Sequence, residues 1–130
     1  MLPFAVTDRI FKTAWFARVA RKARIADAAL VKAVREAELG RADDLGGGVF
    51  KKRLADNRYR SILIARGGAF WVYVYLFAKQ DRANIDDDEL DAFRKLAALY
   101  RQKSDADLAS ELKAGALTEI SNGDETKIQE

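Results

Sequence analysis

Apolar residues recur at helical spacing in the first forty positions of the chain. Residues 10–24 combine apolar positions with interspersed Lys and Arg, which predicts a short strand running into an amphipathic helix. Residues 27–39 keep helical spacing until Gly40, and Asp27 is placed to cap this second helix. Two neighbouring helices with a short connection form an αα-hairpin.

Three later segments have the composition of strands. Residues 59–65 and 70–78 are rich in β-branched and aromatic types, and residues 66–69 form a hairpin signal between them. Residues 49–54 have strand character despite their basic side chains. These segments predict a three-stranded antiparallel meander. Its last strand should direct two sets of side chains to opposite faces, Phe70, Val72, Val74 and Leu76 on one and Trp71, Tyr73, Tyr75 and Phe77 on the other. We expect one face to meet the helices and the other to be an aromatic surface.

Turn and cap residues mark the remaining boundaries. Residues 43–48 contain three consecutive glycines, and we expect a plain turn there, because no Gly-Lys-Ser/Thr follows to make a phosphate-binding loop. Asp86 as N-cap with Glu89 at the third helical position predicts a capping box, and Ser104 with Asp107 predicts another before a helix that ends at Gly115. The polar residues 121–130 are expected to be a disordered tail behind one domain over residues 1–120.

The composition excludes several kinds of chemistry. The 130 residues are 49% hydrophobic, which suits one α+β domain with one core. With no cysteine and no histidine, the chain lacks thiolate chemistry, the commonest general base and the usual transition-metal ligands, so we expect neither a metal nor a cofactor. No apolar run approaches membrane-spanning length, and we expect a soluble protein of the reducing cytoplasm.

Charge is distributed unevenly along the chain. Residues 1–60 hold 14 Lys and Arg against 7 Asp and Glu, whereas residues 61–130 hold 9 against 13. A basic half suits a phosphate-rich partner, although a solvated charged face is the commoner reason for any single cluster.

The basic residues gather on the predicted meander. Lys51 and Arg53 share one face of their strand, Arg58 and Arg60 come from the neighbouring strand, and Lys79 and Arg82 follow the last one. Cations beside aromatic residues would suit RNA, whose phosphates need positive charge and whose bases need aromatic faces. The alternative is that the cations keep an edge strand soluble.

Three segments resemble the RelE/HigB superfamily of toxins in order and spacing. They are FKTAWFAR at residues 11–18, DDLGGGVFKKR at 43–53 with Tyr59-Arg60 after it, and FAKQDRANI at 77–85. The resemblance implies a microbial RNase fold with an N-terminal αα-hairpin packed on a small, mainly antiparallel sheet and C-terminal helices. It also implies cleavage of mRNA in the ribosomal A site, translation inhibition and growth arrest, and a cognate antitoxin, typically of helix-turn-helix type, that covers the basic cleft.

The resemblance also assigns site residues. Lys51 and Arg53 match the two cations of the catalytic strand, and Arg60, after the aromatic Tyr59, matches the third. Four further residues are RNA-binding candidates because of their charge or position: Arg58, Tyr59, Lys79 and Arg82. The chain departs from the family pattern at Gln80, where an arginine would stand, at Asp86, where a tyrosine would stand, and in its shortened loop over residues 55–58.

Such a site could cleave RNA without a metal, by aligning a 2′-hydroxyl for attack on the neighbouring phosphate while cations stabilise the developing charge. Crowding by other cations favours a neutral lysine, so we assign Lys51 as general base, Arg60 to the transition-state phosphate and Arg53 to substrate positioning. Two alternatives remain open. One is a ParE-like DNA gyrase inhibitor without nuclease activity, which Gln80 and Asp86 slightly favour, and the other is an inactive RNA- or ribosome-binding relative.

Overall fold

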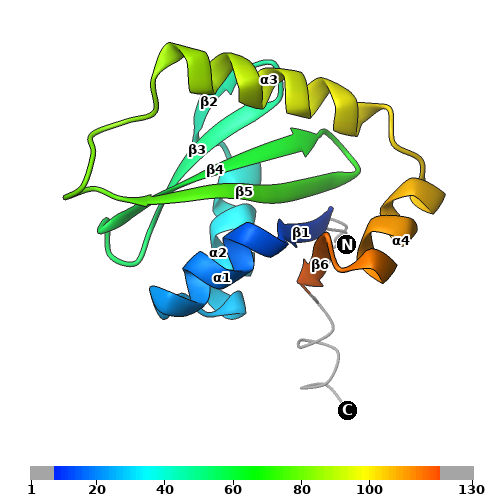
Figure 1. Cartoon of the computed structure of the whole chain (residues 1–130). Coiled ribbons are helices and arrows are strands. Elements are labelled where there is room, and N and C mark those ends of the chain that lie inside the picture. Colours follow the sequence, from blue (N-terminus) through cyan, green and yellow to red (C-terminus); the bar gives the residue numbers. More distant parts are fainter. Residues whose placement is uncertain (1–7, 121–130) are drawn as a thin grey trace.

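A six-stranded sheet forms the centre of the molecule (Figure 1). The computed structural model describes residues 8–120 of the chain, so the predicted tail at residues 121–130 lies outside the described residues. The strand order is β2-β3-β4-β5-β1-β6. The bounds of the strands are β1 Arg9–Thr13, β2 Asp43–Gly46, β3 Val49–Leu54, β4 Tyr59–Arg66, β5 Phe70–Ala78 and β6 Leu117–Ile120.

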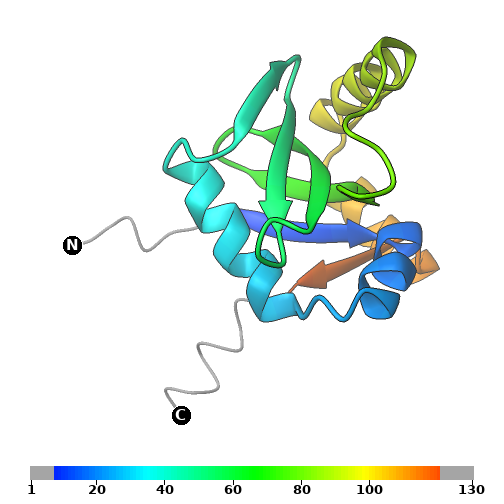
Figure 2. The same cartoon turned by 90° about the vertical axis from the view of Figure 1, so that its left-hand side faces the viewer.

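Helices cover both faces of this sheet. The hairpin of α1 (Ala14–Lys22) and α2 (Asp27–Glu38) lies on one face, and α3 (Asp87–Arg101) crosses the other (Figures 1 and 2). The shorter α4 (Asp105–Ala114) packs beside β6. The predicted α+β architecture, with an N-terminal αα-hairpin and C-terminal helices, is therefore confirmed. No helix within residues 8–120 is long and apolar enough to cross a bilayer.

The central strands are buried from both sides. In β4, Ile62 and Ile64 belong to the core under α3, and Leu63 belongs to the core under the α1–α2 hairpin. The predicted aromatic surface on β5 is wrong, because the hairpin covers it. Trp71 and Tyr73 are buried there, and the Tyr73 hydroxyl donates to the carbonyl oxygen of Leu30 at 2.7 Å.

A β-bulge at Val74 interrupts the alternation of β5. Tyr73 pairs with Leu63 and Tyr75 pairs with Ile62, so Val74 is one extra residue opposite a continuous β4. Beyond the bulge the two faces exchange, and Leu76 joins the core under the hairpin while Phe77 joins the core under α3. The strict two-residue period predicted for this strand therefore fails after Val74.

Two short strands extend the predicted meander. Asp43–Gly46, predicted as part of a plain turn, instead forms β2 and pairs with β3, so only Gly47 and Gly48 make the turn. At the other edge, β1 pairs in parallel with β5, and β6 pairs antiparallel to β1. The meander β3–β4–β5 itself is antiparallel, as predicted.

The capping residues predicted from the sequence identify the starts of two helices correctly. The Asp86 carboxylate accepts from the Glu89 backbone N–H at 2.8 Å, which confirms the first capping box. The Ser104 box is likewise present. The cap predicted at Asp27 is wrong, because Ala26 is the N-cap of α2. Asp27 instead accepts from the ammonium group of Lys12 at 2.7 Å.

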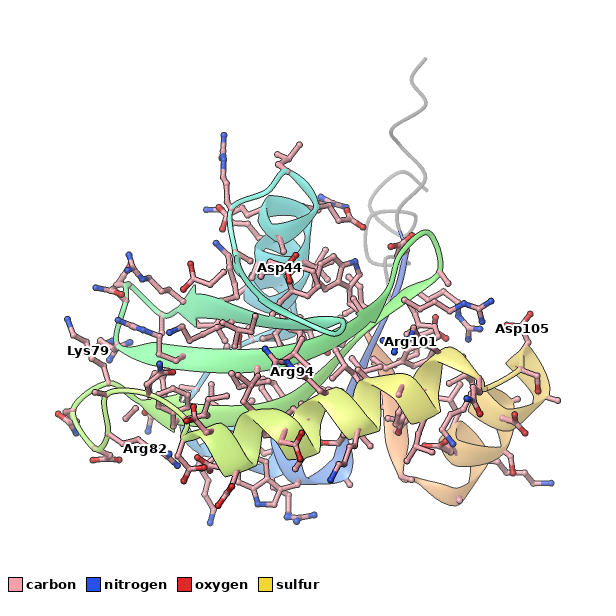
Figure 3. All side chains as sticks on the ribbon, turned by 90° about the horizontal axis from the view of Figure 1, so that it is seen from above. Asp44, Lys79, Arg82, Arg94, Arg101 and Asp105 are labelled. Carbon is pink, nitrogen blue, oxygen red and sulfur yellow. The ribbon has the colours of Figure 1, made fainter. Side chains whose placement is uncertain are left out.

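Arginines of α3 hold the glycine turn between β2 and β3 (Figure 3). Arg94 donates to the carbonyl oxygen of Leu45, and Arg101 donates to that of Gly47 at 3.0 Å. A Cβ at Gly48, where φ is +84°, would lie 3.1 Å from the carbonyl oxygen of Ala65 and 2.9 Å from Arg101 Nη1. The glycines therefore let α3 approach the sheet closely.

Gly48→Ala should lower the free energy of unfolding by about 1–3 kcal/mol, because alanine is strained at a positive φ and its methyl group would press on the backbone of β4. Urea unfolding measures the change. Gly67→Ala is the matched control, since nothing lies within 4 Å of a Cβ there. Equal stability of the two variants would contradict the close approach described for Gly48.

Candidate nucleic-acid interface

The predicted site residues lie at one end of the sheet. The β3–β4 turn and the start of the β5–α3 connection meet there, away from α4 (Figure 1). The backbone N–H of Lys79 donates to the carbonyl oxygen of Arg58 at 2.9 Å and joins the two segments. Residues far apart in the sequence thus share a small area of surface.

Lys51, Arg53 and Arg60 form a cation cluster on the α3 side of the sheet. Arg53 and Arg60 are direct cross-strand partners, and Lys51 lies two residues before Arg53 on the same face. Ile62, which pairs with Lys51, belongs to the core under α3 and identifies this face. The structure therefore brings together the three cations that the sequence assigned to catalysis.

Arg60 is held by the backbone of the β3–β4 turn. Its Nη1 donates to the carbonyl oxygens of Asn57 at 2.9 Å and Tyr59 at 3.3 Å. Within residues 8–120, its Nε and Nη2 donate to no acceptor, and neither Arg53 nor Arg60 pairs with a carboxylate. The side of the guanidinium that can bind two oxygens at once is thus available.

The turn that holds Arg60 is conformationally unusual. Ala55, Asp56 and Asn57 all have positive φ angles, of 53°, 55° and 72°. A left-handed conformation is unfavourable for residues other than glycine, and for alanine in particular. The surrounding contacts keep this conformation, and it aims the carbonyl group of Asn57 at Arg60.

Lys51 lies at the edge of the cation cluster. Its Nζ donates to Asn84 Oδ1 at 3.3 Å and lies 3.8 Å from Asp43 Oδ2. Asn84 also accepts from the backbone N–H of Ile85 at 2.9 Å, so it is fixed within the β5–α3 connection. Sequence reasoning missed Asn84 and Asp43, because neither contact follows from a local pattern.

Arg58, Tyr59 and Lys79 form a second group. They line a hollow of about 520 Å³ between residues 56–59 and 78–80. Tyr59 packs against the core under the α1–α2 hairpin, so its ring lies on the face of the sheet opposite Arg60. The structure therefore places Tyr59 on the face opposite the cation cluster, while Arg58 and Lys79 lie in the turn and the connection at the end of the sheet.

Arg82 is engaged in a contact between elements. Its Nη1 and Nη2 donate to the carboxylate oxygens of Glu89 at 3.0 and 2.5 Å, and its Nη1 donates to the Tyr75 hydroxyl at 3.3 Å. Tyr75 in turn stacks on Trp15, with ring centroids 5.2 Å apart. The role of Arg82 in RNA binding stays a prediction, and any such role would compete with Glu89.

The two departures from the family pattern have different settings. Asp86 is the N-cap of α3, which accounts for an aspartate at that position. Gln80 is exposed beside Lys79 at the mouth of the 520 Å³ hollow (Lys79 is labelled in Figure 3). Within the described part of the chain, no group of three or more acidic residues is arranged to hold a metal ion.

Comparison with known proteins gives one match. The family model for the RelE toxin of the RelE/RelB toxin–antitoxin system matches residues 8–120. No curated protein and no solved structure matches the chain.

The Arg82–Glu89 contact should make stability depend on pH. The guanidinium of Arg82 and the backbone N–H of Asp86 hold the pKa of Glu89 below its ordinary value of 4.5. Because the folded-state pKa is lowered, the stabilisation is complete above pH 4.5 and is lost as pH falls through the folded-state pKa. Glu89→Gln removes the charge and still suits the capping box.

We therefore expect Glu89→Gln to be less stable than wild type near neutral pH, with the difference shrinking as the pH falls below 4.5. Urea unfolding at a series of pH values measures it. Asp91→Asn is the control, because it breaks only an exposed ion pair with Lys95 and should change little. A difference that grows in acid would show that Arg82 does not stabilise the charged form of Glu89.

Proposed function

Because the chain belongs to the RelE family of toxins from toxin–antitoxin systems, we propose that it is a ribosome-dependent mRNA endoribonuclease that inhibits translation. Membership of this family implies an antitoxin partner. We further propose that the antitoxin is of helix-turn-helix type, that it covers the cation cluster, and that the toxin acts in the cytoplasm, where ribosomes and mRNA are found.

The observation that carries the proposal is the placement of Arg53 opposite Arg60. Like charges directly opposite each other on neighbouring strands destabilise a sheet. No carboxylate among residues 8–120 neutralises either guanidinium. Two adjacent arginines without a carboxylate partner favour the binding of an anion. An RNA phosphate between them would reduce the repulsion between the two guanidinium groups.

The geometry supports a phosphoryl-transfer mechanism that needs no metal. The 2′-oxygen of one nucleotide attacks the adjoining phosphorus and forms a 2′,3′-cyclic phosphate, while the P–O5′ bond to the next nucleotide breaks and the leaving 5′-oxygen takes up a proton from water. Arg60, held by the turn, offers its free Nε and Nη2 to two phosphate oxygens as negative charge develops. Arg53 aligns the backbone, and Lys51, fixed by Asn84, is the proposed general base for the 2′-hydroxyl proton.

Gyrase inhibition is the second candidate, and a specific observation favours it. Gln80 carries no charge, and Arg82 is committed to Glu89, so two positions past the last strand contribute little to holding phosphate. A ParE-like toxin would need no catalytic cluster. Gyrase inhibition would not, however, explain why Arg53 and Arg60 lie opposite each other without a carboxylate partner. We therefore place it second to RNA cleavage.

Induced expression should arrest growth, and co-expression of the cognate antitoxin should restore it. The order of events separates the two candidates. Under our proposal, incorporation of labelled amino acids falls before plasmid supercoiling changes. A change in supercoiling that comes first would favour gyrase as the target, and normal growth at confirmed soluble expression would count against any toxin role.

Arg60→Ala should slow cleavage of translated mRNA by about 10²–10³-fold, because it removes a fixed donor to the transition-state phosphate. Arg60→Lys should rescue poorly, since an ammonium group cannot bind two oxygens as a planar fork does. Primer extension on a translated message measures cutting, and co-sedimentation measures ribosome binding, which should weaken only modestly.

Arg66→Ala is the matched control for this experiment. Arg66 is an exposed arginine at the other end of β4, outside both groups of site residues, and its loss should leave cutting unchanged. If wild type cuts no message, or if Arg60→Ala cuts as fast as wild type, the mechanism is wrong.

A further inference from the structure

A groove lies at the end of the sheet near the β3–β4 turn, lined by Tyr59 from the face opposite the cation cluster and by Tyr75 and Phe77 from the α3 face. It consists of the 520 Å³ hollow and an adjoining one of about 440 Å³ that extends to Val19 and Ala23 of α1. Tyr59, Ala78 and Gln80 line both hollows and make them continuous. Volumes in this range suit a small organic group.

Tyr59 differs from the other aromatic residues of the protein. Among residues 8–120, it is the one aromatic side chain that makes no ring contact with another, and its hydroxyl has no hydrogen-bond partner. The ring is only partly buried and lies in the lining of the groove. Tyr59 also packs against the core under the α1–α2 hairpin, and the part of its ring that stays exposed in the groove can stack with a planar ligand.

Gln80 supplies a polar group without a partner. Its side chain is exposed, and no residue in the described range of 8–120 forms a hydrogen bond with its amide. The amide presents an N–H donor and a carbonyl acceptor side by side. That pattern complements adenine, which offers an acceptor ring nitrogen next to its exocyclic amino group.

Cations lie along the rim of the groove. Arg58 and Lys79 line the first hollow, and Lys22 of α1 lines the second. Asp56 and Asp81 also contribute to the lining, so the groove is mixed in charge rather than uniformly basic. A partly exposed aromatic ring, an amide without a hydrogen-bond partner among residues 8–120 and flanking cations together match the base, the base edge and the phosphates of one nucleotide.

We propose that this groove is a nucleobase subsite in which an adenine stacks on Tyr59 and is recognised by Gln80. The proposal rests on the RNA-directed function proposed above and adds a substrate preference to it. Tyr59 and Arg60 are neighbours in β4 whose side chains lie on opposite faces. An RNA strand that passes around the β3–β4 turn would place a phosphate at Arg60 and a nearby base at Tyr59.

The first test titrates the isotope-labelled full-length protein with AMP, GMP, CMP and UMP and follows the amide resonances. AMP should shift the signals of Tyr59, Ala78, Lys79 and Gln80 and bind about fivefold or more tightly than UMP. If AMP binds no better than UMP, or if shifts are confined to Lys51, Arg53 and Arg60, the proposal is overturned. Absence of binding by all four nucleotides overturns it as well.

Variants separate stacking from recognition of the base edge. Tyr59→Leu should weaken all four nucleotides by about fivefold or more, whereas Tyr59→Phe keeps the stacking face and should bind nearly as wild type. Gln80→Ala should abolish the preference for AMP. Gln102→Ala, an exposed glutamine at the far end of α3, is its matched control and should keep that preference. Thermal unfolding midpoints verify that each variant is folded.

Cleavage mapping distinguishes this proposal from the function on which it rests. On a translated message, Gln80→Ala should lose any enrichment of adenine beside the cut, while Arg60→Ala should lose cutting at every site. If wild type cuts nothing but AMP still binds at Tyr59, the nuclease function fails and the subsite stands. If wild type cuts and AMP does not bind at Tyr59, the subsite fails and the nuclease function stands.

Discussion

Burial of both faces of β4 and β5 is the constraint on which the rest of the structure depends. Neither face of these strands can meet water, so the α1–α2 hairpin must cover one and α3 the other. The glycine turn held by Arg94 and Arg101 lets α3 lie close enough to do so. Both groups of candidate site residues lie at the end of the sheet that carries the β3–β4 turn and the start of the β5–α3 connection.

The interactions that destabilise the candidate site are confined to one end of the sheet. Repulsion between Arg53 and Arg60 and the left-handed residues of the β3–β4 turn both oppose folding. Each lies at the end of strands whose middle residues are buried, such as Ile62, Leu63 and Ile64 of β4. The core therefore fixes the backbone of Arg53 and Arg60 firmly enough that these two residues need no carboxylate partner to stay in place.

Local patterns predicted the features that depend on local physics. The capping boxes at Asp86 and Ser104 and the antiparallel meander follow from neighbouring residues. Two other features depend on contacts between distant residues: the pairing of the short strands β2 and β6, and the ion pair of Arg82 with Glu89. The periodicity of apolar residues along a strand or helix does not predict such contacts. The aromatic residues of β5 were misplaced for the same reason, since only the complete fold shows that α1, α2 and α3 cover both faces.

The bulge at Val74 bears on how such chains are aligned. One inserted residue leaves both cores intact, because β4 and β5 resume their pairing immediately beyond it. Position along this strand is therefore defined by the partner on β4 and not by counting from the preceding turn. A lineage that gained or lost this residue would keep its fold but change which side chain a residue-by-residue alignment assigns to the place of Gln80. Homologous positions past the bulge should be identified by strand register.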